Sequence, residues 1–202
     1  MHNYTIETTR LLLRPLTIDD AQDVFEWVSD EQVARYMVYP TYKNIEQVYA
    51  WLTSIQDSVE RHREYHFGYV RKQDGKLIGS GSIGPDSERE DFWGFGYNFR
   101  RDCWGMGYAT EAARAMLQFA HDTLGADKFS SSHVDVNRAS GRVMEKCGLH
   151  FEKYLTDSLK YIYGNIEQSL LFLHDRQIVI GSHSESFKNL IEHLTVLTCY
   201  AD

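Results

Sequence analysis

The stretch RRDCWGMGYATEAARAML, residues 100–117, decides the fold. It places Gly105 and Gly107 one residue apart, directly before a segment rich in helix formers. From Ala109 onward the apolar residues recur at helical spacing, and the pattern ends at Gly125. The sequence therefore predicts a helix whose first turn follows a loop that lacks side chains at two positions.

Two explanations account for these glycines. The first turn of a helix has unpaired N–H groups and the positive end of the helix dipole, and a loop without side chains lets an anion reach both. The segment then reads as a phosphate cradle. Alternatively, Gly105 and Gly107 only supply backbone dihedrals that other residues avoid. The spacing leaves both explanations open.

The common nucleotide motifs fit the segment poorly. A dinucleotide fingerprint needs GxGxxG, and Thr110 stands where its third glycine belongs. A Walker A loop, GxxxxGK[ST], is absent from the sequence. A nucleotide-binding module thus stays only a weak alternative.

The rest of the chain predicts a mixed α/β sheet. Alternation and turn residues indicate strands, and 3.6-residue spacing indicates helices. The glycines within residues 91–99 suggest a bulge or a close approach by a ligand. Strands are predicted at residues 9–16, 66–72, 76–84, 91–99 and 128–136, helices at 17–28, 44–55 and 138–147, and a closing hairpin at 159–173 about Gly164-Asn165.

Composition indicates an ordinary globular protein. Of 202 residues, 43% are hydrophobic and 25% charged, and the net charge of -8 argues against a nucleic-acid partner. The first residues show no signal pattern, and no apolar run approaches the roughly 20 residues of a membrane helix. The three cysteines form no CxxC, which suggests reduced thiols. We expect a cytoplasmic protein without a membrane partner.

Three ordered segments carry a family resemblance. They read TIETTRLLLRPLTIDDAQDVFEWVSD, YNFRRDCWGMGYATEAARAML and VDVNRASGRVMEKCGLHFE. Together they resemble the GNAT N-acetyltransferases, and most closely the RimJ/RimL branch that acetylates ribosomal-protein N-termini. The resemblance spans roughly residues 5–176, and we take residues 1–176 as one GNAT domain.

The resemblance implies the GNAT fold, a mixed sheet with two splayed parallel central strands, here those holding Phe99 and Val134. Acetyl-CoA would lie in the opening between them, with pantetheine paired to the backbone of Asn98 and Phe99. An N–H of that strand would serve as an oxyanion donor. The pyrophosphate would sit on the cradle, formed by Trp104, Gly105, Met106, Gly107, Tyr108, Ala109 and Thr110.

The resemblance also assigns candidate chemistry. Asn137 would bind the pantetheine amides and Ser140 would lie near the thioester sulfur as a candidate general acid. Both residues also suit a plain helix start, with Asn137 as the N-cap. Glu111 is a candidate base or water-orienting group, although a carboxylate in the first turn of a helix is favourable without any function.

Acceptor-binding candidates are Tyr36, Met37, Tyr39 and Trp93. The aromatic loop at residues 34–42 either holds an amine or simply caps the core. Residues 177–202 extend beyond the family core as an amphipathic helix, packed on the domain or forming a dimer contact. The sequence leaves monomer and homodimer open.

Two positions depart from the family pattern. Asp102 stands where the cradle usually opens with Gln or Arg, which puts a carboxylate near the expected pyrophosphate. Gly148-Leu149 replaces the usual Gly-Phe. The His62–His66 pair in HREYH lacks the HExxH pattern, and we expect no metal.

The resemblance therefore implies an N-acetyltransferase. It would transfer the acetyl group of acetyl-CoA to a primary amine, a protein N-terminus or a small molecule, by direct attack in a ternary complex. A non-catalytic acyl-CoA sensor that kept the cradle and lost transfer is the alternative.

Overall fold

The computed structural model describes residues 4–87, 89–155 and 169–175. The C-terminal extension at 177–202 and the predicted turn at Gly164-Asn165 lie outside these residues. None of the helices in the described segments combines the length and the apolar character that a membrane crossing requires.

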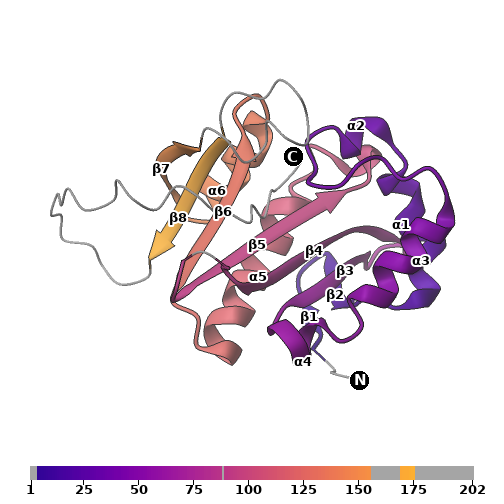
Figure 1. The fold of residues 1–202 in the computed structure, drawn as a ribbon, viewed down its shortest axis with the longest axis horizontal. Coiled ribbons are helices and arrows are strands. Elements are labelled where there is room, and N and C mark those ends of the chain that lie inside the picture. Colours follow the sequence, from indigo (N-terminus) through magenta and orange to yellow (C-terminus); the bar gives the residue numbers. More distant parts are fainter. Residues whose placement is uncertain (1–3, 88, 156–168, 176–202) are drawn as a thin grey trace, which may run out of the picture.

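A single mixed sheet organises the molecule (Figure 1). Its eight strands lie in the order β1-β2-β3-β4-β5-β6-β8-β7. Neighbours are antiparallel except β5 and β6, which run parallel. The strands are β1 (Ile6–Glu7), β2 (Leu11–Pro15), β3 (Tyr65–Arg71), β4 (Leu77–Pro85), β5 (Phe92–Phe99), β6 (Lys128–Val134), β7 (His150–Leu155) and β8 (Ser169–Asp175).

Helices cover both faces of this sheet. Asn44 caps the third helix and Gly107, with φ of 77°, precedes the longest one. The helices are α1 (Ala21–Val28), α2 (Glu31–Ala34), α3 (Ile45–Ser54), α4 (Ser58–His62), α5 (Tyr108–Leu124) and α6 (Arg138–Lys146), with single 3₁₀ turns at η1 (Ile18–Asp20) and η2 (Arg101–Cys103).

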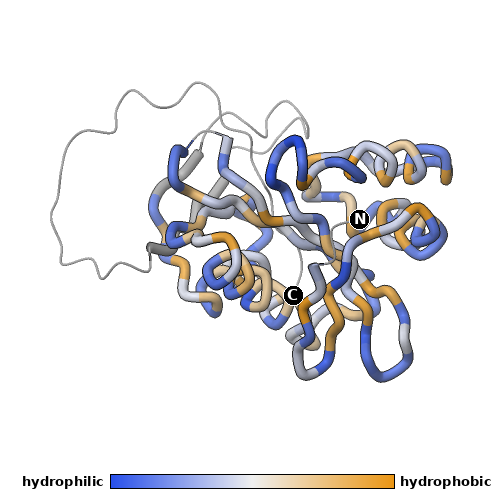
Figure 2. The backbone as a smooth tube through the Cα atoms, turned by 90° about the horizontal axis from the view of Figure 1, so that it is seen from below, coloured by the Kyte–Doolittle hydropathy of each residue, from blue (hydrophilic) through white to orange (hydrophobic). Residues whose placement is uncertain are grey.

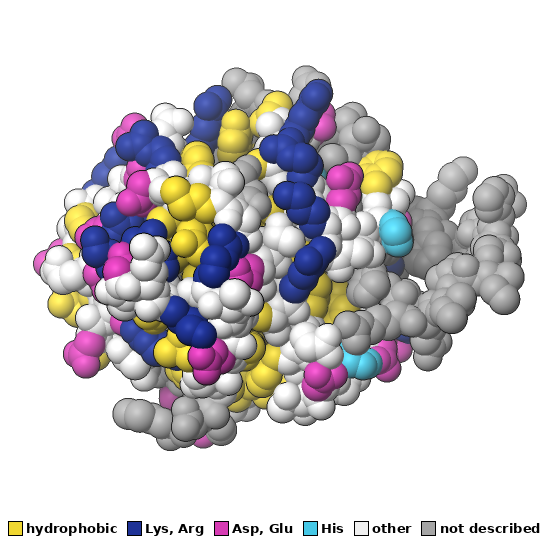
Figure 3. All heavy atoms as spheres, turned by 180° about the vertical axis from the view of Figure 1, so that it is seen from behind, with side chains coloured by type: hydrophobic (Ala, Val, Ile, Leu, Met, Phe, Trp, Pro, Cys, Tyr) yellow, Lys and Arg dark blue, Asp and Glu magenta, His cyan; other side chains and the backbone are white. Residues whose placement is uncertain are grey.

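Two hydrophobic clusters lie on opposite faces of the sheet. The larger packs α5 and α6 against the side chains of β2 to β6, including Phe95 and Phe99. The smaller packs α1 and α3 around Trp27 and Leu52. Figure 2 shows the hydrophobic stretches on the strands and helices, with hydrophilic loops between them. Seen from behind, acidic and basic side chains mingle on the surface (Figure 3).

The predicted mixed sheet is confirmed, and some details differ. β1, α2 and α4 were not expected, because each is too short for a periodic pattern. β8 pairs with β7, which begins at His150, earlier than the predicted hairpin. The predicted bulge in residues 91–99 is absent from the β4–β5 register, and the nearest irregularity lies between Tyr69 and Val70 on β3.

The parallel strands β5 and β6 pair over only part of their length. β5 pairs with β6 only from Phe92↔Lys128 to Gly94↔Ser130. Directly after this paired region, the Ser131 hydroxyl donates a hydrogen bond to the Phe95 carbonyl at 2.8 Å. Beyond it the ends carrying Phe99 and Val134 have no mutual register, so the predicted splay is confirmed.

Candidate active site

The two cradle glycines adopt the left-handed conformation. Gly105 has φ of 74° and Gly107 of 77°, values that side-chain-bearing residues rarely adopt. A Cβ at Gly105 would meet no atom within 4 Å, so space is open there. The glycines thus meet a structural need and leave a bare backbone at the mouth of α5.

The cradle is tied to its surroundings at both ends. The Trp104 indole donates to the Phe99 carbonyl at 3.0 Å, which joins the loop to the end of β5. Arg10 donates to the Met106 carbonyl at 2.7 Å and its guanidinium lies 4.4 Å from the centre of the Tyr108 ring. These contacts use carbonyls and a ring face, and leave the loop amides to other partners.

Thr110 supplies an independent sign of a ligand. Its hydroxyl is buried in the first turn of α5 and finds no hydrogen-bond partner within the described part of the chain. An unsatisfied buried hydroxyl is costly, and such groups mark places where a ligand or water completes the bonding. The residue fits a phosphate oxygen at the helix start.

The carboxylate of Asp102 faces a cation. Arg100 donates to it with Nε and Nη2 at 3.1 and 3.2 Å. That bond from Arg100 lowers the pKa of Asp102, so the group is an anion already paired with a cation. The departure from the family pattern thus adds little unpaired negative charge near the cradle.

Glu111 is held by the β1–β2 turn. Its carboxylate accepts from the Thr8 hydroxyl at 2.6 Å, from Arg10 N at 2.8 Å and from Arg10 Nε at 2.6 Å. Burial alone would raise the pKa of Glu111, but the bonds from Thr8 and Arg10 outweigh it and the pKa is lowered. A carboxylate held in this way is a weak base.

Across the opening between β5 and β6, Tyr97 reaches α6. Its hydroxyl lies 3.2 Å from Ser140 Oγ and 3.4 Å from the Ser140 carbonyl. Asn137 caps α6 through Oδ1, which accepts from Ser140 N at 3.4 Å. Ser140 is fully buried. The structure therefore brings the two predicted residues together and adds Tyr97.

A cavity of about 200 Å³ opens on the face of the sheet covered by α1 and α3. Its walls are apolar and aromatic, and its floor is formed by β3, β4 and β5. Met37, Tyr39, Tyr42 and Trp51 stand in the walls. The floor carries Ser80, Ser82, Gly96 and Asn98, and Glu64 and His66 close one side.

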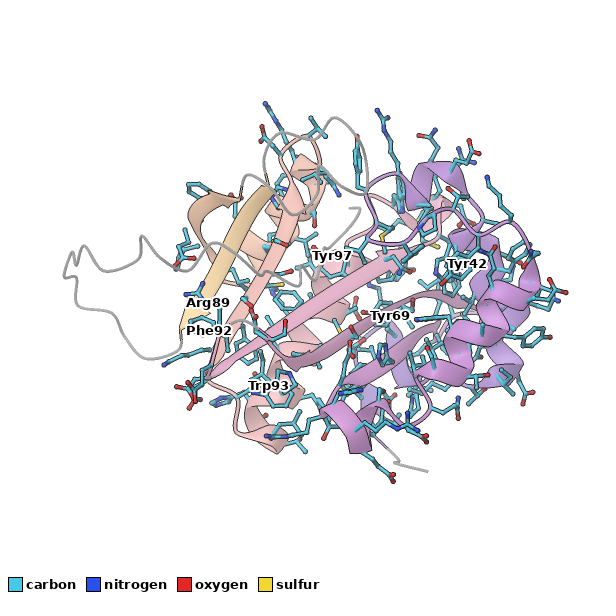
Figure 4. All side chains as sticks on the ribbon, in the orientation of Figure 1. Tyr42, Tyr69, Arg89, Phe92, Trp93 and Tyr97 are labelled. Carbon is cyan, nitrogen blue, oxygen red and sulfur yellow. The ribbon has the colours of Figure 1, made fainter. Side chains whose placement is uncertain are left out.

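Two predicted acceptor residues lie elsewhere. Tyr36 does not line the cavity. The Arg35 guanidinium lies over the Tyr36 ring, 5.2 Å from its centre. Trp93 is 7% exposed and belongs to the larger hydrophobic cluster, and the Arg63 guanidinium lies 5.3 Å from the centre of its ring. Figure 4 shows Trp93 and Tyr97 toward opposite ends of β5. The structure joins only Met37 and Tyr39 of the predicted four to the cavity.

Sequence reasoning missed several residues at the site. Tyr97, Glu64, His66 and Ser82 were not predicted as site residues, and Tyr42 was included only as part of the aromatic loop at residues 34–42. One signal was available, because Ser80 and Ser82 alternate along β4 and so share the face of the sheet. The pairing of residues from different strands is a matter of register, which the sequence alone does not supply.

Metal ligands and reactive thiols are not features of this site. Among the described residues, no group of three or more potential ligands could hold a metal ion. Cys103 and Cys147 are free thiols. Burial raises the pKa of Cys103, and it raises that of Cys147 to about 12, so neither is readily ionised.

The splayed parallel strands and the bare loop at the start of α5 are features that the family resemblance implies. A family model described as an acetyltransferase (GNAT) domain matches residues 10–150, more than two thirds of the chain. The chain belongs to the GNAT acetyltransferase family, and it is an acetyl-CoA-dependent N-acetyltransferase by that membership. The predicted family is confirmed.

Among curated relatives, the chain is similar to an uncharacterized N-acetyltransferase, YoaA, of Bacillus subtilis, with 26% identity over 79% of this chain and 89% of the relative. It is also similar to the FsC-acetyl coenzyme A-N(2)-transacetylase of Aspergillus fumigatus, with 29% identity over 82% of this chain and 75% of the relative.

Solved structures share the fold. A GNAT acetyltransferase of Bacillus anthracis superposes with a TM-score of 0.76, 20% identity, and coverage of 87% of this chain and 100% of that one. The ribosomal-protein-S5-alanine acetyltransferase of Vibrio fischeri superposes with a TM-score of 0.75, 17% identity, and coverage of 87% of this chain and 98% of that one.

Proposed function

We propose that this protein transfers the acetyl group of acetyl-CoA to a primary amine by direct attack in a ternary complex. The observation that carries the proposal is the opening between β5 and β6, with the bare loop of Gly105 and Gly107 at its rim. The amine nitrogen bonds to the thioester carbonyl carbon, the carbon–sulfur bond breaks, and the amine loses a proton.

The cradle would hold the CoA pyrophosphate. Backbone amides from Gly105 to Thr110 stand at the start of α5, where the helix dipole favours an anion, whereas the Trp104 amide donates to the Arg101 carbonyl at 3.2 Å. The buried Thr110 hydroxyl supplies a further donor. The edge of β5 at Asn98 and Phe99, left unpaired with β6, suits the pantetheine amides as an added strand.

Ser140 and Tyr97 would serve the leaving group. The two hydroxyls are coupled at 3.2 Å beside the opening, and a hydroxyl pair can pass a proton to the departing thiolate. Asn137 then acts both as the cap of α6 and as a candidate donor to pantetheine. Ser140 stays the candidate acid, with Tyr97 as its partner.

Glu111 suits a positioning role better than a catalytic one. Its three hydrogen bonds bind the first turn of α5 to the β1–β2 turn, and its lowered pKa reduces its strength as a base. The prediction that Glu111 acts as a base is therefore carried forward only as the weaker alternative.

Direct transfer is supported over a covalent acetyl-enzyme. A cysteine nucleophile needs an accessible thiolate, yet of the two cysteines in the described residues Cys103 is 1% exposed and the pKa of Cys147 is raised to about 12. Neither of these two residues lines the cavity beside β5. Cys199 lies outside the described residues. Neither described cysteine suits a covalent step, and the amine would attack acetyl-CoA itself.

The acceptor would be compact where it enters. The cavity is about 200 Å³, below the about 300 Å³ at which drug-sized pockets begin. It suits the amine-bearing end of a molecule, either a chain terminus or a small amine. The relatives differ in their named acceptors, ribosomal protein S5 in one and FsC in another.

Acetylation of an amine panel tests the proposal. The purified protein is incubated with acetyl-CoA and small amines, amino-acid amides and short peptides with free N-termini, and the products are weighed by mass spectrometry. A gain of one acetyl group with release of one CoA per product is expected. Saturable acetyl-CoA binding without transfer to any amine would favour the alternative, a non-catalytic acyl-CoA sensor.

A further inference from the structure

A row of polar side chains crosses the floor of the acceptor cavity. On three neighbouring strands, His66 of β3 is in register with Ser82 of β4, and Ser82 is in register with Gly96 of β5. Paired residues point to the same face of a sheet, so the row runs from His66 to a position without a side chain. That position adjoins Tyr97, beside the opening.

Glu64 completes the row at its outer end. Its Oε1 lies 3.4 Å from His66 Nε2, and Ser82 donates a hydrogen bond to the same carboxylate. The Glu64 side chain passes over Gly84, where a Cβ would stand 3.1 Å from it. A glycine at this position therefore lets Glu64 lie close to the sheet.

The pair is shielded but reachable. The His66 side chain is 13% exposed and that of Glu64 is 32% exposed, and both line the cavity. Trp51 meets the His66 ring edge-on, with ring centroids 6.3 Å apart. Burial would raise the pKa of Glu64, but the bonds from His66 and Ser82 outweigh it, so the pKa is lowered and Glu64 is an anion at neutral pH.

Amide formation from an amine needs a proton acceptor in this cavity. An alkylamine of pKa about 10.4 is an ammonium ion at neutral pH and has no lone pair to attack with. The negative charge of Glu64 attracts that cation into an apolar cavity, and an imidazole is the side chain best suited to take up its proton.

Resting on the proposed transfer to an amine, we propose that Glu64 and His66 form the acceptor-side base of this enzyme, selecting a compact cationic amine and removing its proton. The proton leaves the ammonium nitrogen and arrives at His66 Nδ1. Nε2–H stays directed to Glu64, whose charge stabilises the imidazolium. Ser82 positions the Glu64 carboxylate, and the freed lone pair attacks the thioester over Gly96.

Other titratable groups face this pair and belong to any pH profile. Tyr39 and Tyr42 come from the loop after α2, and His62 from the end of α4 acts on Glu64 through its charge. Tyr97 of β5 also contributes to the cavity lining, but its hydroxyl lies at Ser140. Burial raises the pKa of Tyr42, so its phenol is neutral at neutral pH. His66→Gln removes the imidazole of His66 and leaves His62 and the tyrosines in place.

A matched pair of acceptors separates a base from a structural residue. Benzylamine is charged at neutral pH, whereas O-benzylhydroxylamine has nearly the same shape and is already neutral. His66→Gln should lower kcat/KM for benzylamine by about 100-fold and for O-benzylhydroxylamine by less than about threefold. Glu64→Gln should show the same split, and the exposed His150→Gln should change neither rate.

The outcomes decide the proposal. An equal loss with both acceptors would make the pair structural, and no loss with either would remove it from the reaction. Calorimetry with acetyl-CoA on every variant shows whether the cofactor site is intact. If acetyl-CoA does not bind the unaltered protein, the proposed transfer itself fails and this inference falls with it.

A second readout needs no turnover. The ring signals of His66 are assigned in NMR spectra by their loss in His66→Gln, and benzylamine is then added to the CoA-bound protein. Saturable shifts of these signals, reduced in Glu64→Gln, are the expected result. If acetyl-CoA binds and benzylamine leaves the His66 signals unmoved, the pair does not face the acceptor and the inference is overturned.

Discussion

The cradle and the acceptor cavity are built in opposite ways. The cradle is a run of consecutive residues at the start of α5, and its decisive property is the backbone of Gly105 and Gly107. The cavity takes its walls from α1, α3 and the loop after α2, and its floor from three strands. The cradle therefore depends on one local segment, whereas the cavity depends on how several distant segments pack together.

The two regions therefore make different demands on the chain. Both lie within residues 10–150, the segment that the family model matches. We therefore expect substitutions in the cradle to act on acetyl-CoA and substitutions in the cavity to act on the amine. The following variants test that separation.

The largest effect is expected from Gly107→Glu. The new side chain is forced into a conformation with φ of 77° and brings a negative charge to the cradle. The Kd for acetyl-CoA in calorimetry should rise by at least about 100-fold, since about 2.7 kcal/mol corresponds to that factor.

Gly75→Glu is the matched control. Gly75 has φ of 72° in the turn between β3 and β4, so the strain and the charge are the same in a remote place. Its Kd should be unaltered. Equal Kd values in the two variants would end the assignment of the cradle.

A change in the cavity wall should act on the amine alone. Tyr42 packs edge-on against Tyr39 with ring centroids 5.5 Å apart. Tyr42→Leu should raise KM for the acceptor about fivefold, since an aromatic contact contributes about 1 kcal/mol, and leave the acetyl-CoA Kd within twofold. The exposed Tyr49→Leu is the control. A parallel loss of acetyl-CoA binding in Tyr42→Leu would contradict the separation.

Ser140→Ala tests the link between the two regions. Removing the hydroxyl that meets Tyr97 should lower kcat about fivefold, since one hydrogen bond contributes about 1 kcal/mol, with a smaller change in acetyl-CoA Kd. Tyr97→Phe should give a similar loss, and the double variant little more than either alone. An unchanged kcat in Ser140→Ala would remove Ser140 from the mechanism.

The smallest effect on activity is expected from Glu111→Gln. Its turnover should stay within about threefold, while the free energy of unfolding falls by about 1 kcal/mol, a modest value because the Arg10 side chain is 43% exposed. Urea unfolding measures this loss. A collapse of kcat with unchanged stability would return Glu111 to the role of base.

The stabilisation by Glu111 depends on pH in a definite direction. The folded-state pKa of Glu111 lies below the unfolded one because Thr8 and Arg10 bind the carboxylate. The contribution is therefore complete above the unfolded pKa and is lost as the pH falls through the folded pKa. Unfolding curves of Glu111→Gln and the unaltered protein should differ at neutral pH and converge in acid.

The cradle was predictable from sequence because its signals are local. Glycine spacing, the apolar repeat after Ala109 and the cap at Asn137 each depend on neighbours along the chain. The pairing of Ser140 with Tyr97 and that of Glu64 with His66 depend on register and on helix placement. Trp93 shows where prediction from sequence stops. It lies on β5, which forms part of the cavity floor, but its side chain is buried in the core toward the end of β5 opposite to Tyr97.

Calorimetric titration of the purified protein with acetyl-CoA tests the central claim most directly, with NAD and ATP as controls. The account predicts saturable binding of acetyl-CoA and none of the two nucleotides, because the splayed strands and the bare loop at α5 suit a CoA pyrophosphate with its pantetheine arm. The absence of acetyl-CoA binding, or equal binding of NAD or ATP, would contradict it and leave Gly105 and Gly107 with a structural role alone.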